Sequence, residues 1–265
     1  MPRSGAAVLQ PGDVHVRFCA SEGYGGTALD ALAADLSPDE RSRADRFVFP
    51  RDRRDFTVAH AMLRSVLSSY HSAAPGAWQF DTEPGGKPML AGPLARESGL
   101  SFNLSHTTGL VACAVTRGGD VGVDVESLDR AAQARELAQR FFAPAEAAEL
   151  GALEPDPCRQ RFIEIWTLKE AYVKALGTGL ATQLSQFAFL NAEGGFRFVP
   201  DGSTQAEAWR FWLLAPEPRS RMAVAVRTHS SQEPRMQAWS WHPGPVTTGT
   251  PELLTPVLPV GSARS

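Results

Sequence analysis

The sequence predicts an α+β protein made of two similar halves. The motif R-F-x-x-P occurs at residues 46–50 and again at residues 140–144. Each copy is followed by a helical pattern and then by strand patterns, which is the order that an internal duplication produces. The order of these elements suggests that the halves meet near Gly118. Ligands often bind at such a junction. The predicted units are residues 1–118, residues 119–228 and a Pro- and Gly-rich tail, 229–265.

The composition is that of an ordinary globular protein. Of 265 residues, 43% are apolar and 21% are charged, which is typical of soluble domains. A net charge of −3 argues against general nucleic-acid binding. Cys19, Cys113 and Cys158 are widely spaced, which favours reduced thiols in a cytoplasm. No signal peptide or membrane span is expected, so we predict a cytoplasmic protein without nucleic-acid or membrane partners.

Two helices are predicted in the first half. Residues 37–49 begin with Ser37 as an N-cap and Pro38 in the first turn. Pro50 ends this helix, and residues 51–70 resume with apolar side chains at helical spacing. After a turn in "EPGGKP", strands are predicted at "LSFNLS", "GLVACAV" and "VGVDVE", with the polar "HTT" and the turn "RGGD" between them.

The second half repeats the order of helices and strands. Helices are predicted at residues 134–142, 144–153 and 160–176, and strands within residues 184–200, 207–216 and 221–229. After His242 the sequence is rich in Pro and Gly. Such a composition predicts a strap or disordered tail without a packed element.

The strand "VGVDVE" carries two acidic residues on one face. Because a strand alternates with period two, Gly122, Asp124 and Glu126 share the face opposite the valines. One interpretation is an edge strand with an acidic face toward solvent. The other is half of a cation site, since Mg²⁺ prefers carboxylate oxygens, with Gly122 allowing a ligand to approach the backbone.

The segment "WTLKEAYVKALGTGL" places a third carboxylate on a helix. Trp166, Glu170 and Lys174 are four residues apart and form one stripe. Glu170 and Lys174 could be only a surface ion pair, but the large aromatic above them indicates partial burial. Gly177 and Gly179 then end the helix.

The segment "NLSHTTG" predicts a hydroxyl-rich turn around one histidine. Ser105, His106 and Thr107 suit phosphate binding, while a plain turn with a solvent histidine is the alternative. Ser105 and His106 do not form the catalytic pair of a serine hydrolase, because the nucleophile motif G-x-S-x-G is absent. Among the many cations, Arg43 and Lys87 are the candidates for ligand binding.

With these residues identified, the chain resembles a 4′-phosphopantetheinyl transferase of the surfactin-synthetase-activating type. The resemblance is carried, in order, by "GGKPML", "FNLSHTTGLVACAV", "VGVDVE" and "WTLKEAYVKALGTGL". It implies a pseudo-twofold pair of α+β halves, each a small mixed or antiparallel sheet packed with helices, with coenzyme A in the cleft between them. It also implies transfer of phosphopantetheine from coenzyme A to a serine of an acyl or peptidyl carrier protein by a monomer, releasing adenosine 3′,5′-bisphosphate.

The resemblance assigns roles to individual residues. The implied Mg²⁺ ligands are Asp124, Glu126 and Glu170. The implied catalytic residues are Glu170, Lys174 and Asp124, with Glu170 or a water bound to the ion as general base. The implied coenzyme A ligands are Arg43, Gly86, Lys87, Pro88, Ser105, His106, Thr107 and Lys174. Glu40 and Phe56 depart from the lysine and threonine of some relatives.

The sequence leaves three other functions to compare. A non-catalytic coenzyme A or nucleotide-binding regulator would lack one of the three acids, and all three are present. A Mg²⁺-dependent pyrophosphohydrolase would use the same residues with water in place of the carrier. An RNA-binding module is disfavoured by the acidic balance of the chain.

Overall fold

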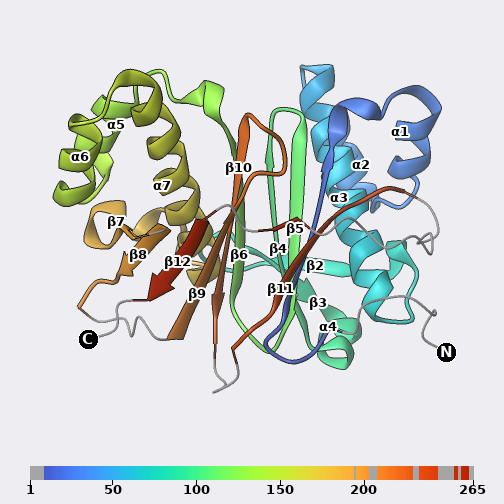
Figure 1. The fold of residues 1–265 in the computed structure, drawn as a ribbon. Helices are drawn as coiled ribbons and strands as arrows, with labels where there is room; N and C mark the ends of the chain where they lie inside the picture. Colours follow the sequence, from blue (N-terminus) through green and yellow to red (C-terminus); the bar gives the residue numbers. More distant parts are fainter. Residues whose placement is uncertain are drawn as a thin grey trace.

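The protein is described by a computed structural model. It describes residues 9–193, 195–202, 208–228, 233–243, 254–255 and 258–262. The fold is α+β with two halves side by side, as predicted (Figure 1). The sheets lie in the middle, and each half carries its helices on the outer flank.

The first half contains a four-stranded sheet in the order β11-β1-β5-β4. Its elements are β1 (Val14–Ala20), α1 (Gly26–Ala33), α2 (Pro38–Asp45), α3 (Pro50–Tyr70), β2 (Gln79–Thr82), β3 (Pro88–Ala91), α4 (Gly92–Ser98), β4 (Leu100–Thr107) and β5 (Leu110–Arg117). The strand β11 (Met236–Ser240) pairs in parallel with β1, whereas the β1–β5 and β5–β4 pairs are antiparallel. β2 and β3 form a separate hairpin.

The second half contains a six-stranded sheet in the order β6-β10-β9-β12-β8-β7. Its elements are β6 (Val121–Ser127), α5 (Ala134–Phe141), α6 (Pro144–Gly151), α7 (Pro155–Leu176), β7 (Ala188–Ala192), β8 (Gly195–Val199), β9 (Trp209–Leu214), β10 (Ser220–Arg227) and β12 (Leu258–Ser262). β12 is antiparallel to β9 and parallel to β8.

Local sequence signals explain the helix boundaries. The Ser37 side chain accepts a hydrogen bond from the Glu40 amide, and the Glu40 side chain accepts one from the Ser37 amide, so α2 begins with a full capping box. In the two copies of R-F-x-x-P, Pro50 and Pro144 are the first residues of α3 and α6. α7 ends at Gly177, whose φ of 70° suits a residue without a side chain.

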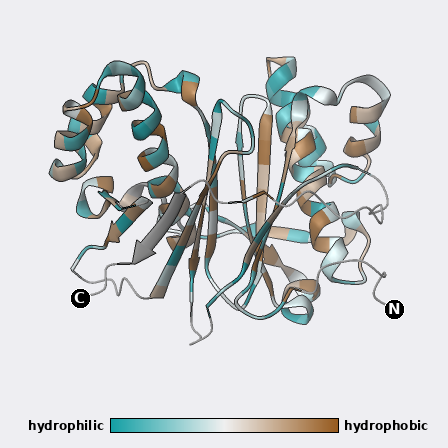
Figure 2. Ribbon diagram, in the orientation of Figure 1, coloured by the Kyte–Doolittle hydropathy of each residue, from teal (hydrophilic) through white to brown (hydrophobic). Residues whose placement is uncertain are grey.

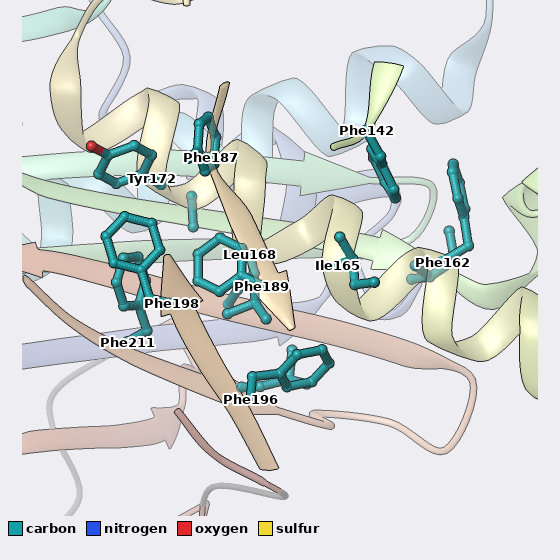
Figure 3. Packing of buried hydrophobic residues seen from close by; sticks show 14 of the residues in the cluster. Phe142, Phe162, Ile165, Leu168, Tyr172, Phe187, Phe189, Phe196, Phe198 and Phe211 are labelled. Atoms are coloured by element: carbon teal, nitrogen blue, oxygen red, sulfur yellow. The ribbon is translucent and has the colours of Figure 1, made fainter. Parts of the chain in front are cut away.

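Three apolar clusters hold the molecule together. One lies between α3 and the first sheet, and one between α7 and the second sheet. Figure 3 shows the aromatic side chains of the second, where Tyr172 of α7 meets Phe187, Phe198 and Phe211 with ring centroids 4.8 to 6.0 Å apart. Each such buried side chain contributes roughly 1.5–3 kcal/mol.

The third cluster joins the two halves. Val121, Val123 and Val125 of β6 pack with Val14 and Val16 of β1, so the two sheets bury a common apolar layer. Hydrophobic residues run along the central strands of both sheets in Figure 2, whereas the helices alternate between the two kinds of residue. The predicted face of β6 with three valines is therefore confirmed.

Several predictions about the elements need correction. The polar "HTT" is a turn only at Thr108, because β4 continues through His106 and Thr107. The prediction that no packed element follows His242 is wrong where that segment is described, because it supplies β12 to the second sheet. β11 lies earlier in the predicted unit 229–265 and joins the first sheet. The rest of that tail, and residues 194, 207 and 229 of the predicted strands, lie outside the described residues. Within the described ranges, no helix is long and apolar enough to cross a membrane, and all three cysteines are buried and free.

Candidate active site

The close approach of α7 to β6 sets the geometry of the site. A Cβ atom built on Gly122 would lie 2.0 Å from the carbonyl oxygen of Ala171 and 2.5 Å from the amide nitrogen of Ala175. Only glycine permits this contact, so α7 packs directly against the acidic face of β6. The expectation that Gly122 admits a ligand is therefore wrong, because the helix backbone takes that space.

This packing brings the predicted acids together. Asp124 and Glu126 are buried, with 4% and 8% of their surfaces exposed, which rules out a solvent-facing acidic strand. A cavity of about 380 Å³ gathers them with the stripe on α7 and with the end of β4. It is lined by Leu104, Ser105, His106, Asp124, Glu126, Trp166, Glu170 and Lys174.

Asp124 is held through one of its two carboxylate oxygens. Lys174 Nζ donates to Asp124 Oδ1 at 2.6 Å, and Ser105 Oγ donates to the same oxygen at 3.0 Å. Lys174 Nζ also donates to Ser105 Oγ at 2.8 Å. Asp124 Oδ2 is buried and has no hydrogen-bond partner among the described residues. The carboxylate thus keeps one acceptor oxygen unused.

The other two carboxylates have raised pKa values. Burial, together with the charge of Asp124, raises the pKa of Glu126 to about 7, although Arg130 Nη1 donates to both of its oxygens at 3.0 and 2.8 Å. Burial and the charge of Asp124 also raise the pKa of Glu170, against the opposing charge of Lys174. Mutual repulsion of this kind is relieved by a cation or a proton.

His106 stands at the wall of the cavity. Its neighbour Ser105 points toward β6, and His106 lines the same cavity from β4. Loss of hydration lowers the pKa of His106, and Lys174 reinforces this effect while Asp55 opposes it. The imidazole carries a ring N–H in either protonation state and can offer it to an anion.

A second, larger cavity of about 760 Å³ adjoins the first. Gly86, Lys87 and Pro88 line it and stay predictions as coenzyme A ligands, and Glu170 and Lys174 line both cavities. Lys87 Nζ donates to the Ala175 carbonyl at 3.1 Å, which joins the first half to the end of α7. Burial lowers the pKa of Lys87, opposed by Glu83 and Asp120.

Two predicted ligands lie outside both cavities. Arg43 is exposed on α2, with its guanidinium 5.2 Å from the Phe56 ring. Thr107 is buried and lines neither cavity. The sequence reasoning also missed wall residues of the larger cavity, which include Arg140 and Phe141. Both belong to the second R-F-x-x-P motif, which was interpreted only as a sign of duplication.

Comparison with known proteins assigns the family. The description "4′-phosphopantetheinyl transferase superfamily" belongs to a family profile matching residues 120–227, and "4′-phosphopantetheinyl transferase, N-terminal" to one matching residues 27–117. The 4′-phosphopantetheinyl transferase HetI of Nostoc sp. is 42% identical over 75% of this chain and 81% of its own length. The chain belongs to the 4′-phosphopantetheinyl transferase superfamily. It is an enzyme of this class, which modifies carrier proteins with a group from coenzyme A.

A second related protein and one solved structure are also similar to this transferase. The 4′-phosphopantetheinyl transferase Sfp of Bacillus subtilis is 30% identical over 58% of this chain and 65% of its own length. A crystal structure of a holo-(acyl-carrier-protein) synthase from Bacillus anthracis, in complex with CoA (3′,5′-ADP), matches 42% of this chain and 96% of that chain. Its TM-score is 0.37, with 18% identity.

The donor set of the small cavity suits a hard cation. Three carboxylates line it, and Asp124 Oδ2 is buried without a partner, which is what a site for Mg²⁺ requires. Among the described residues, no group of three Asp, Glu, His or Cys side chains lies close enough together to coordinate an ion. Lys174 and Arg130 instead partner Asp124 and Glu126. The residues fit, but ion binding requires these side chains to rearrange.

Proposed function

We propose that this transferase moves the 4′-phosphopantetheine group of coenzyme A to a serine of an apo acyl or peptidyl carrier protein. The reaction depends on Mg²⁺ and releases adenosine 3′,5′-bisphosphate. The observation that carries the proposal is the cavity in which Asp124, Glu126 and Glu170 meet Lys174 and His106 at the junction of the halves. No smaller part of the chain supplies this set, since His106 comes from β4 and the others from β6 and α7.

The two adjoining cavities suit the two parts of coenzyme A. Lys174 and His106 in the smaller cavity offer donors to phosphate oxygens, and Lys87 offers another at the larger one. The larger cavity has an apolar wall that includes Phe141, Trp166 and Val173. Such a wall fits the pantetheine arm, whose chain is mostly apolar. Arg43 and Thr107 stay predictions as coenzyme A ligands.

The acids and the lysine have separate roles at the pyrophosphate. Asp124, Glu126 and Glu170 would hold Mg²⁺, which neutralises pyrophosphate charge when bound. Lys174, 2.6 Å from Asp124, would turn its ammonium toward the phosphate once the acid has another partner. A cation there would also remove the repulsion that raises the pKa values of Glu126 and Glu170.

The transfer step is a displacement at phosphorus. The carrier serine oxygen forms a bond to the phosphorus that bears the pantetheine. The bond from that phosphorus to the bridging oxygen breaks, and its electron pair leaves with adenosine 3′,5′-bisphosphate. The serine proton goes to Glu170 or to a water held beside it. Glu170 lines both cavities, which supports a role as base on the carrier serine.

We further propose a monomer that works in the cytoplasm. A single chain supplies both walls of the junction, so a partner subunit is not needed to complete the site. The carrier is of the fatty-acid, polyketide or peptide-synthetase kind. The net charge of −3 does not favour a nucleic acid as partner, and none of the described helices could span a membrane.

Mass spectrometry separates the candidate functions. The enzyme is incubated with coenzyme A, Mg²⁺ and an apo-carrier protein. A carrier that gains one phosphopantetheine supports transfer, whereas free phosphopantetheine supports a pyrophosphohydrolase. An unchanged carrier with intact, bound coenzyme A supports a regulator. Asp129→Asn is a matched control, because Asp129 follows β6 closely but lies exposed outside both cavities.

A further inference from the structure

The hairpin of β2 and β3 belongs to neither of the two large sheets. Its strands pair only with each other, as a two-stranded sheet of their own. At the base of the hairpin, Phe80 meets the Phe102 ring of β4 with centroids 5.4 Å apart, and Leu90 is buried. The tip, residues 83–87, carries Lys87. Because a two-stranded hairpin is only marginally stable by itself, the position of this tip depends on what the tip touches.

The tip touches the end of α7, which belongs to the other half. A Cβ atom built on Gly85 would lie 1.9 Å from the carbonyl oxygen of Gly177 and 3.1 Å from its carbonyl carbon. From the other side, a Cβ atom built on Gly179 would lie 2.8 Å from the carbonyl oxygen of Gly85. These neighbours are main-chain atoms, which cannot swing aside as a flexible side chain can. Only a residue without a side chain at position 85 lets the two segments meet this closely.

Gly85 is needed for space and not for backbone conformation. Its φ lies outside the left-handed region, whereas the next residue, Gly86, has a φ of 86°. Alanine at position 85 is therefore compatible with the local backbone. Its effect is confined to the collision with Gly177, which would push the hairpin tip away from α7.

The contact brings Lys87 to the wall of the larger cavity. Lys87 Nζ donates to the Ala175 carbonyl at 3.1 Å, in the last turn of α7, where the carbonyl end of a helix attracts a cation. Among the described residues this is the one hydrogen bond of the ammonium, which has three donors, so two remain for phosphate oxygens. Gly85 and Lys87 of the tip line the cavity together with Gly177 and Gly179. The tip and the end of α7 thus form one continuous wall.

We propose that Gly85 is a positioning residue, whose missing side chain docks the hairpin tip on the end of α7 and thereby holds the Lys87 ammonium at the coenzyme A phosphates. This inference rests on the proposed function, in which Lys87 is one of the phosphate donors. Loss of the contact should weaken coenzyme A binding and spare the transfer step at saturating coenzyme A, because Lys87 lies outside the smaller cavity that holds the acids.

A double-mutant cycle tests whether Gly85 acts through Lys87. Calorimetry without divalent ions gives Kd for coenzyme A, and carrier modification at saturating coenzyme A gives kcat. We expect Lys87→Ala to raise Kd about tenfold, through loss of a charge-assisted hydrogen bond, and Gly85→Ala to raise it about fivefold. In the Lys87→Ala background, Gly85→Ala should change Kd by less than about twofold. The kcat of all three variants should stay within about twofold of wild type.

Two further variants guard the cycle. Gly179→Ala disturbs the same contact from the side of α7, so it should also raise Kd, and only while Lys87 is present. Gly151→Ala is the control for an added methyl group, because nothing lies within 4 Å of that carbon, and it should keep the wild-type Kd.

Three outcomes of the cycle would overturn the proposal. The first is a wild-type Kd in Gly85→Ala, and the second is a wild-type Kd in Lys87→Ala. The third is an equal effect of Gly85→Ala with and without Lys87, which would mark a merely structural role. Absence of transfer by the wild type would instead refute the proposed function, and the Kd values would still decide whether Gly85 acts through Lys87.

Discussion

At the scale of single residues, Glu170 combines two properties that a general base needs. It lines both cavities, and burial with the charge of Asp124 raises its pKa above the ordinary value of a glutamate. We expect Glu170→Gln to lower kcat on the order of 100- to 10,000-fold, the usual contribution of a positioned base. Because the base must be ionised, wild-type activity should rise with pH through the pKa of Glu170, which burial raises and bound Mg²⁺ would lower. Steady-state kinetics measured from pH 5 to pH 8 would test both.

The matched control for this variant is Glu136→Gln, which alters an exposed glutamate of α5 that lines neither cavity. It should retain wild-type kcat. Near-normal turnover by Glu170→Gln would remove Glu170 from proton transfer and leave that role to water.

Glu40 illustrates a charged residue that makes structural contacts within the first half. It accepts hydrogen bonds from the Ser37 amide and from Arg64, and it contacts His60 Nδ1 at 3.0 Å. Although burial opposes the shift, His60, the Ser37 amide and Arg64 lower the pKa of Glu40 from 4.5 to about 2. Its stabilising contribution is therefore complete above pH 4.5 and is lost as pH falls toward 2.

Glu40→Gln should lower the free energy of unfolding by about 3 kcal/mol at pH 7, because Arg64 is 2% exposed and would lose its charged partner. The difference from wild type should shrink between pH 4.5 and pH 2. Urea unfolding at several pH values would measure it. A difference that stays constant over this range would contradict the assigned pKa.

The residues of the site differ in how well sequence alone could place them. Helical and strand periods were enough to align Glu170 with Lys174, and Asp124 with Glu126. His106 was assigned to a turn, because the extension of β4 through Thr107 depends on its pairing with Leu110 of β5. The burial of Ser105 and its hydrogen bonds to Asp124 and Lys174 depend on contact between the halves, which no local pattern encodes.

At the scale of elements, the contact of α7 with β6 leaves no room for a side chain at Gly122. Gly122→Ala would place a methyl carbon 2.0 Å from the Ala171 carbonyl, so the helix must move. We expect a loss of about 3 kcal/mol or more in the free energy of unfolding, at the upper end for overpacking. Gly151→Ala is the control, because nothing lies within 4 Å of its added carbon. Thermal unfolding with equal Tm for the two variants would contradict this packing.

The long helices were predictable and the short peripheral elements were not. α3 and α7 have sustained apolar periods and clear capping signals, so their existence follows from sequence, although α7 begins at Pro155 and not at residue 160. β1 was missed because "VHVRFCA" mixes a histidine and an arginine into an apolar run. Its pairing with β11, more than 200 residues away, is what fixes it as a strand.

At the scale of the whole molecule, the C-terminal segment supplies one strand to each of the two large sheets. Ala238 and Trp239 of β11 are buried, and Arg17 of β1 lies 3.9 Å from the Trp239 ring. A chain ending at Thr228 loses this strand and β12, whereas one ending at Pro243 loses only β12. The chain that ends at Thr228 should lose about 6 kcal/mol or more of its free energy of unfolding, because removing each large buried aromatic costs about 3–5 kcal/mol. Wild-type Tm in both chains would show that the segment is a dispensable tail.

The two-half arrangement explains why the composition of the C-terminal segment gave a wrong prediction of its structure. Pro and Gly disfavour an independent element, but a strand that joins an existing sheet needs only a few backbone hydrogen bonds. The duplication predicted from R-F-x-x-P agrees with Pro50 and Pro144 as helix starts in both halves. The boundary near Gly118 stays a prediction. The two matched family regions leave residues 118–119 between them.

The central claim is that three acids at this junction hold Mg²⁺ for phosphopantetheine transfer, and its most direct test is the mass of an apo-carrier protein. The enzyme is stripped of divalent ions with a chelator, incubated with carrier and coenzyme A, and then supplied with Mg²⁺. The carrier should gain one phosphopantetheine only after Mg²⁺ is restored, and it should gain none with Asp124→Asn, while Asp129→Asn behaves as wild type. Complete modification without a divalent ion, or by Asp124→Asn, would contradict the claim.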